Sequence, residues 1–97
     1  MNAHGIISSV VTKVGKHSWN GSTLYHLRRE PDNMHDSNAV SVRCVAAHGG
    51  PPGVVVGWLS SGTAAMIAPT LDAGITMVAR YTGQTHWGDS CIRIRVQ

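Results

Sequence analysis

The stretch LRREPDNMHDSNAVSV, residues 27–42, joins two strand-like segments through a polar turn. Its first residues complete a segment from Leu24 to Arg29 in which polar and apolar side chains alternate. The turn, EPDNMHDSN, is rich in Asp and Asn, whose short side chains accept hydrogen bonds from nearby backbone amides. The segment AVSVRCV then alternates again. This part of the chain therefore predicts two strands connected by an ordered turn.

Further strands are predicted on both sides of this segment. Residues 5–14, GIISSVVTKV, are β-branched and apolar, and VVVGWL, ITMVARY and SCIRIRV follow later in the chain. Within VVVGWL, Gly57 indicates a bulge or a close approach of another backbone. In SCIRIRV, the aliphatic residues are predicted to face inward, while Arg93 and Arg95 share the outer face. Six short strands are expected in all.

One main helix is predicted over residues 62–72, with room for short helical turns elsewhere. Ser60 or Ser61 would cap its start, and Gly74 would end it in a left-handed conformation. Pro69 is expected to kink or shorten the helix, because proline lacks the amide that the helical ladder needs. Six strands, one helix and Gly-rich turns together predict a mostly β fold, a small six-stranded barrel.

Length and composition favour one folded domain over residues 1–97. Apolar residues make up 42% of the chain and charged residues 13%, a balance unlike that of disordered proteins. No apolar run approaches the roughly 20 residues of a membrane-spanning helix, and the first residues do not resemble a secretory signal. The net charge of +3 permits an anionic partner without requiring one.

Catalytic and metal-binding motifs are not evident, so we expect neither an enzyme nor a cofactor. The sequence has no Gly-x-Ser-x-Gly, Gly-x-x-x-x-Gly-Lys or His-Glu-x-x-His pattern. His86, Asp89 and Cys91 are close together, but zinc ligands usually form two short pairs, and we interpret them as a turn beside a buried thiol. Cys44 and Cys91 lie in predicted strands, where a thiol behaves as a small hydrophobe. Two such cysteines are typical of a reduced cytoplasmic protein.

Aromatic side chains near polar and basic ones are typical of proteins that bind single-stranded nucleic acid, because bases stack on flat rings. Lys16, His17 and Trp19 share one predicted loop, and Trp58 and Tyr81 lie near strand ends. The chain has three Trp, two Tyr and no Phe, so the same rings could instead fill the core. The residues alone leave both interpretations open.

The segment LRREPDNMHDSNAVSV resembles the signature of the HIRAN domain family, in which an apolar-basic-acidic-Pro segment precedes spaced Asn, Asp and Asn-Ala positions. VVVGWLS, residues 54–60, is similar to the family's apolar-Gly-x-Leu strand, and AAMIAPTLDAG, residues 64–74, is similar to its helix. The resemblance covers essentially the whole chain. It implies a six-stranded OB-like barrel with helical additions.

The resemblance also implies a non-catalytic module that captures single-stranded DNA at a free 3′-hydroxyl end, in DNA repair or replication-fork processing. Family members occur fused to ATPases or repair nucleases and as small stand-alone bacterial proteins, so a helicase, ATPase or nuclease in trans is an expected partner. A bacterial member would be associated with the nucleoid. The alternative is a protein–protein interaction module with a degenerate DNA pocket.

Three regions of the chain match the family's pocket: the loop after the first strand, the motif turn, and the end of the glycine-containing strand, together with a late aromatic. The matching or neighbouring positions are Lys16, His17, Ser18, Trp19, Asn33, His35, Asp36, Trp58, Ser61 and Tyr81. At two of them the family residue is lost, because Ser18 stands at a stacking tyrosine and Ser61 at a lysine. These two departures motivate the alternative of a degenerate pocket.

The family's roles suggest specific contacts here. Asp36 is expected to accept a hydrogen bond from the terminal 3′-hydroxyl and to repel a 3′-phosphate. Trp19 and Trp58 would sandwich the last bases, while Lys16 and His17 hold phosphates.

A purely structural role for the turn is the competing interpretation. The Asp and Asn side chains would then bond only to the backbone, which is the role we expect for Asn38. Arg29 would pair with Glu30 or Asp32 and hold the loop in place.

Overall fold

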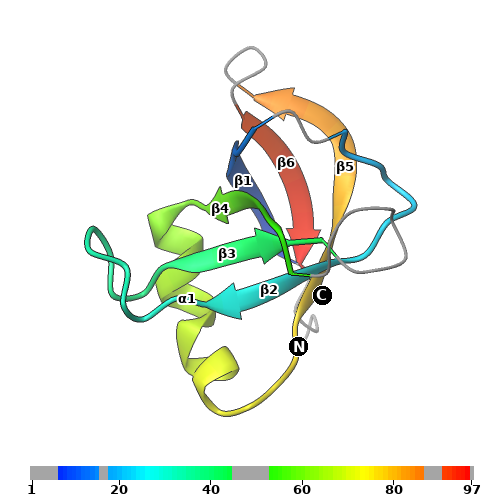
Figure 1. The fold of residues 1–97 in the computed structure, drawn as a ribbon. Coiled ribbons are helices and arrows are strands. Elements are labelled where there is room, and N and C mark those ends of the chain that lie inside the picture. Colours follow the sequence, from blue (N-terminus) through cyan, green and yellow to red (C-terminus); the bar gives the residue numbers. More distant parts are fainter. Residues whose placement is uncertain (1–6, 16–17, 45–52, 87–90, 97) are drawn as a thin grey trace.

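The computed structural model describes residues 7–15, 18–44, 53–86 and 91–96. Within them the chain forms a closed antiparallel barrel with the strand order β1-β4-β3-β2-β5-β6, and one helix follows β4 (Figure 1). This confirms the predicted six-stranded barrel. The elements are β1 (Ile7–Lys13), β2 (Tyr25–Arg29), β3 (Val40–Arg43), β4 (Val55–Leu59), α1 (Ser61–Asp72), β5 (Val78–His86) and β6 (Cys91–Val96).

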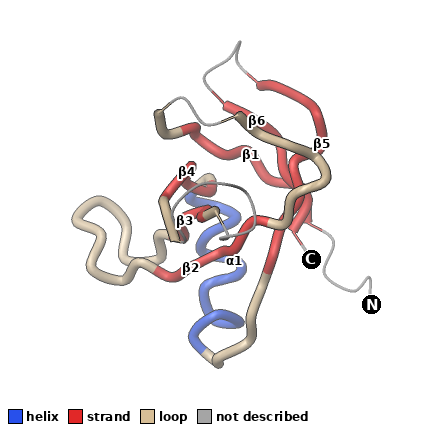
Figure 2. The backbone as a smooth tube through the Cα atoms, turned by 45° about the vertical axis from the view of Figure 1, so that its right-hand side comes forward, coloured by secondary structure: helices blue, strands red, loops and turns tan. Residues whose placement is uncertain are grey.

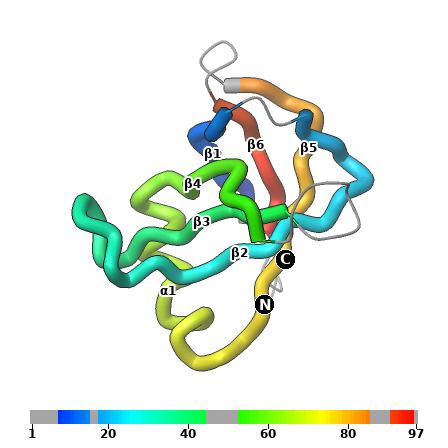
Figure 3. The backbone as a smooth tube through the Cα atoms, viewed as in Figure 1, coloured from blue at the N-terminus to red at the C-terminus, as the bar shows by residue number. Residues whose placement is uncertain are grey.

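The barrel closes because β1 pairs with strands on both of its sides. On one side Val11 lies opposite Leu59 of β4, and on the other Ile7 lies opposite Val96 of β6. β5 pairs with two different strands: its first residues pair with β2, and the rest of the strand pairs with β6. In Figures 1 and 3, β1, β5 and β6 therefore lie together in the upper part of the molecule, with β2, β3 and β4 below them.

Strand alternation builds the core, as expected from the apolar positions. In β6 the aliphatic side chains are buried while Arg95 is exposed and Arg93 is half-buried. The same alternation buries Tyr25 and Leu27 of β2. Both cysteines are buried thiols, as predicted, with Cys91 in β6 and Cys44 directly after β3. The largest fully buried side chains are Tyr25, Ile92, Ile94, Val11, Val40, Val42 and Val96.

Gly57 is the point where β1 and β4 approach most tightly. A Cβ at this position would collide with the side chain of Val11 and lie 3.1 Å from the backbone oxygen of Thr12. Next to it, the β3–β4 register shifts, with Val42 opposite Gly57 but Arg43 opposite Val55. The predicted close approach is therefore confirmed, and an irregularity of the β3–β4 register lies next to the glycine.

The helix α1 packs beneath the barrel through small and aliphatic residues, and Ala64, Ile67 and Ala68 are buried (Figure 2). It begins after Ser60 and ends with Gly74, which has a φ of 86° and donates its N–H to the carbonyl of Leu71. The glycine end agrees with the prediction, whereas Ser60 occupies the N-cap position without a side-chain capping hydrogen bond, and its hydroxyl donates to Oγ1 of Thr63 instead. Among the described residues, no helix has the length and apolar character that crossing a membrane would require.

Pro69 does not shorten α1, contrary to the expectation. The helix continues to Asp72, and the carbonyl of Pro69 accepts the N–H of Ala73. Because Pro69 lies on the exposed side of the last turns, its ring avoids the core, and the helix loses one hydrogen bond at this position.

Candidate functional site

The β2–β3 loop, residues 30–39, is folded by its own short polar side chains. The Oδ1 atom of Asn33 accepts the backbone N–H of His35 at 2.8 Å and that of Asp36 at 3.0 Å. The Oδ1 atom of Asp36 accepts the N–H of Asn38 at 2.8 Å. The predicted ordered turn is therefore present, and Asn33 and Asp36 help to build it. The Oδ2 atom of Asp36 accepts no hydrogen bond from the described residues.

Arg29 anchors this loop to the helix. Its Nη1 donates to the carbonyl oxygen of Ser37 at 2.8 Å, and its Nε donates to Oδ1 of Asp72 at 2.9 Å. The expectation that Arg29 pairs with Glu30 or Asp32 is therefore wrong. Those carboxylates are close in sequence, but the helix brings Asp72 to the guanidinium from 43 residues away.

Glu30 belongs to a different network at the base of the loop, which the sequence did not indicate. Its Oε2 accepts hydrogen bonds from the Ser41 hydroxyl and from Nη2 of Arg43, both at 2.6 Å. Burial alone would raise the pKa of Glu30. The hydrogen bonds from Ser41 and Arg43 and the charge of Arg43 outweigh burial and lower the pKa below its ordinary value. Glu30 is therefore held as a carboxylate that braces the ends of β2 and β3.

A pocket of about 280 Å³ lies between this loop and the junction of β4 with α1. Trp58 and Ser61 form one side of the pocket, while loop residues form the other. Of the ten predicted site residues, the structure brings together five. The full lining is Asn33, His35, Asp36, Ala39, Trp58, Leu59 and Ser61.

The pocket's groups have complementary chemistry. Trp58 presents a half-buried indole, Asp36 a half-buried carboxylate, and His35 an exposed ring. Asn33 keeps its side-chain amide as a donor, because its Oδ1 is used by the loop. A ligand with a flat ring and a terminal hydroxyl could stack on the indole and donate to the carboxylate.

Trp19 and Tyr81 lie elsewhere. Trp19 packs against the core with its ring centroid 4.7 Å from that of Tyr25 and 6.3 Å from that of Tyr81. It reaches the inner side of β4, where a Cβ on Gly57 would lie 3.4 Å from its Cη2. Trp58, the next residue of β4, points to the outer side. The two indoles are therefore on opposite sides of the strand and do not form the expected sandwich.

The aromatic group of Trp19, Tyr25 and Tyr81 closes one end of the barrel. The Tyr25 hydroxyl accepts the backbone N–H of Asn20 at 3.1 Å and fixes the β1–β2 loop to this end. Burial raises the pKa of Tyr25, although that hydrogen bond opposes the shift. Figures 1 and 2 both show the β1–β2 loop and the β2–β3 loop on opposite sides of the molecule. For Trp19 and Tyr81, filling the core is the better interpretation.

The remaining candidates are only partly described. Ser18 is exposed beside Trp19. The predicted phosphate contacts Lys16 and His17 lie outside the described residues, as do Asp89 and the side chain of His86. Among the described residues, no group of three or more His, Cys, Asp or Glu could hold a metal ion.

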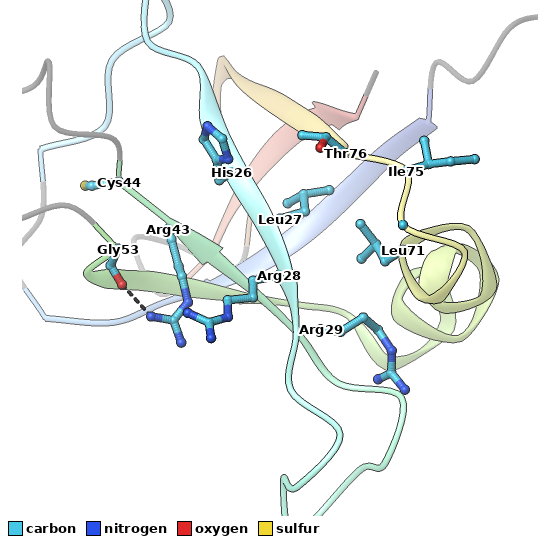
Figure 4. Close-up of a pocket in the computed structure, with 11 residues that line it drawn as sticks. His26, Leu27, Arg28, Arg29, Arg43, Cys44, Gly53, Leu71, Ile75 and Thr76 are labelled. Atoms are coloured by element: carbon cyan, nitrogen blue, oxygen red, sulfur yellow. Dashed lines mark hydrogen bonds between the residues drawn. The ribbon is translucent and has the colours of Figure 1, made fainter.

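A larger pocket, of about 550 Å³, follows β2 on the side of the α1–β5 connection, where the sequence predicted no site. Figure 4 shows the side chains of Arg28 and Arg43 to one side of β2, and those of Leu71 and Ile75 to the other. Arg43 also donates to the carbonyl of Gly53. The alternation of apolar and basic residues in YHLRR could have indicated a groove that is lined by both kinds of residue.

Comparison with known proteins identifies the fold and the motif together. The family model described as the HIRAN domain matches residues 6–97. The chain belongs to the HIRAN domain family. A crystal structure of the HIRAN domain of human HLTF superimposes on this HIRAN domain with a TM-score of 0.67 and 22% sequence identity, covering 95% of this chain and 73% of that one. This likeness shows a shared fold. No curated protein matches the chain in sequence.

Proposed function

We propose that this HIRAN domain binds single-stranded DNA at a free 3′-hydroxyl end, in the pocket formed by the β2–β3 loop and the β4–α1 junction. The observation that carries the proposal is the pairing of Asp36 with Trp58 in one small pocket. A terminal base stacks on the indole, and the 3′-hydroxyl donates to Oδ2 of Asp36. Family membership supports a nucleic-acid ligand.

The negative charge of Asp36 should make the pocket prefer a 3′-hydroxyl end to a 3′-phosphate end. A 3′-phosphate would place its negative oxygens against the Asp36 carboxylate, whereas a hydroxyl gains a hydrogen bond to a charged acceptor. Such a bond contributes about 1.5–3 kcal/mol, so we expect a preference of at least tenfold for the hydroxyl. Stacking on a single indole adds roughly 1–3 kcal/mol, and overall binding should be weak, about micromolar.

The test is fluorescence anisotropy with three labelled ligands: a single strand ending in 3′-hydroxyl, the same strand ending in 3′-phosphate, and a blunt duplex. Asp36→Asn keeps the Oδ1 acceptor that the loop needs and replaces Oδ2 with a donor. It should reduce the preference for the hydroxyl to less than threefold while leaving the fold intact.

Asp32→Asn is the matched control, because Asp32 is an exposed carboxylate of the same loop outside the pocket lining. It removes the same charge and should leave the preference unchanged. Equal affinity of the parent for all three ligands would contradict recognition of a 3′ end.

The wider setting belongs to the same proposal. The chain acts as one non-catalytic domain over residues 1–97, in the cytoplasm, in DNA repair or replication-fork processing. A helicase, ATPase or nuclease acts in trans. Incubating labelled DNA with the protein and magnesium or manganese should give no cleavage.

A protein–protein interaction module is the second candidate, and the larger pocket along β2 is the observation that favours it. Its apolar residues, Leu71 and Ile75, lie across β2 from Arg28 and Arg43, a combination that suits a peptide with both characters. Pull-down from host extract with and without nuclease separates the two functions. A protein retained after nuclease treatment supports this second role, whereas loss of every bound protein supports the first.

A further inference from the structure

The outer face of β5 and β6 carries three arginines side by side, which we call the arginine face: Arg80, Arg93 and Arg95. Arg80 lies directly opposite Arg95 in the β5–β6 register. Arg93 is two residues before Arg95 and points to the same side, because Ile94 and Val96 face the core. Like charges directly opposite each other in a sheet destabilise it. The fold by itself gives no reason for this arrangement.

No described carboxylate neutralises the arginine face. The two ion pairs within the described residues use other arginines, Arg29 with Asp72 and Arg43 with Glu30. The strands β1, β5 and β6 contain four Lys and Arg residues and no acidic one. The acidic residues that the structure describes, Glu30, Asp32, Asp36 and Asp72, lie instead on the β2–β3 loop and at the end of α1, while Asp89 lies outside the described residues.

Hydrogen bonds also hold parts of the arginine face in place. The Nη1 atom of Arg80 donates to the carbonyl oxygen of Ser22 at 3.2 Å, which directs the guanidinium. The hydroxyl of Thr82 donates to the carbonyl oxygen of Arg93 at 3.1 Å, so a small polar side chain stands beside the arginines.

Strand register connects the arginine face to the pocket. Across β1, Arg93 lies opposite Val10, and two residues further along the same strand Thr12 lies opposite Trp58. Neighbouring strands are about 4.8 Å apart, so β6 is about 10 Å from β4. The outer side of β1 between them carries only small or uncharged side chains, Ser8, Val10 and Thr12. A strand whose last base stacks on Trp58 can therefore continue over β1 to the arginines.

We propose that the arginine face binds the phosphate backbone of the nucleic acid whose 3′ end occupies the pocket. The proposal rests on the proposed function and adds a direction to it, because the strand leaves the pocket across β1 toward β6. Arg93 and Arg95 are about 6.8 Å apart along β6, so the two guanidiniums can bind different phosphates. Guanidinium groups suit this contact, since their planar donors match phosphate oxygens.

The length of the ligand separates this face from the pocket. A trinucleotide with a 3′-hydroxyl fills the pocket, whereas a dodecanucleotide also crosses β1. Arg93→Gln combined with Arg95→Gln should weaken dodecanucleotide binding about fivefold at low salt and leave the trinucleotide unchanged. The slope of log affinity against log salt should become shallower by about 1.4. The pair Arg93→Lys and Arg95→Lys, which keeps both charges, should restore the slope.

Arg28→Gln is the matched control. Arg28 is exposed on β2 and also lies two strands from Trp58, on the opposite side through Ser41. Removing this charge should change dodecanucleotide affinity less than twofold. An equal loss from Arg28→Gln, or an equal loss of the trinucleotide in the Arg93/Arg95 variant, would overturn the proposed path.

The two proposals fail in different ways. If the parent protein shows no preference for a 3′-hydroxyl, end recognition is wrong, and a length-dependent loss in the Arg93/Arg95 variant still supports phosphate binding at this face. If the parent binds the trinucleotide and the dodecanucleotide equally, the arginine face does not bind nucleic acid. The same conclusion follows if an acidic peptide binds this face and DNA does not displace it.

Discussion

Replacing Gly57 with alanine should destabilise the barrel by about 2–3 kcal/mol, near the upper end for overpacking a core. The added Cβ meets the side chain of Val11, which is fully buried, and the backbone oxygen of Thr12 at 3.1 Å. Neither can withdraw easily, because β1 is paired on both sides in a closed barrel. The φ of Gly57 is not in the left-handed region, so the cost is steric rather than conformational.

Urea denaturation followed by tryptophan fluorescence measures this cost, and thermal unfolding should show a Tm lower by roughly 8–24 °C for a domain of this size. Gly62→Ala is the control, because Gly62 lies in the first turn of α1 with no atom within 4 Å of an added Cβ. It should be neutral or stabilise by up to about 1 kcal/mol.

A second substitution tests the cause. If the collision with Val11 carries the cost, Val11→Ala should be less harmful in the Gly57→Ala background than in the parent, with a coupling of at least about 0.5 kcal/mol. Unchanged stability of Gly57→Ala, or strict additivity of the two changes, would refute the close approach of β1 and β4.

Four other substitutions test separate parts of the fold and the site. Because the pKa of Glu30 is lowered in the folded state, its carboxylate stabilises the fold at pH values above its ordinary pKa of 4.5. This stability is lost as the pH falls through the lower pKa of the folded state. Denaturation at pH 6 and pH 3 should therefore show a smaller acid-induced loss of stability for Glu30→Gln than for the parent. Arg29→Ala releases the loop from Asp72 and should reduce the hydroxyl preference several-fold, measured by anisotropy, whereas an unchanged preference would show that the loop holds its shape unaided. Trp19→Ala should lower the stability measured in urea by roughly 2–3 kcal/mol, because Trp19 packs against the core. Trp58→Ala should lower stability by under about 1 kcal/mol and weaken DNA binding by about 1–3 kcal/mol, because Trp58 lines the pocket. The reverse pattern would mean that the roles of the two indoles are exchanged.

Local patterns in the sequence predicted the strands and the helix well. Alternation located the inward side chains of β2 and β6, because burial on one face of a strand repeats every second residue. It misled at Ser41, which lies between two core valines and yet is fully buried. The cause is the ion pair of Glu30 and Arg43, whose hydrogen bonds to the Ser41 hydroxyl cover the outer face at this point.

Only part of the pocket lining could be anticipated from the sequence. The motif turn and the β4–α1 junction are short segments with characteristic residues, and they meet at the pocket. The position of Trp19 could not be predicted from the sequence, because it depends on contacts with Tyr25 and Tyr81, which come from other strands. β5 also extends beyond the predicted ITMVARY segment to His86, across an irregular register near Gly83. Long-range packing of this kind leaves no periodic signal in one sequence.

The pairing of Ile7 with Val96 has a consequence for how the molecule forms. Contacts between residues so distant along the chain require a large loop to close first, and proteins dominated by such contacts fold over milliseconds to seconds. During synthesis, β6 emerges after every other strand, so until then the facing edges of β1 and β5 lack a partner. Until β6 is added, these unpaired strand edges are open to pairing with neighbouring chains, so aggregation during expression should fall when a chaperone that covers them is present.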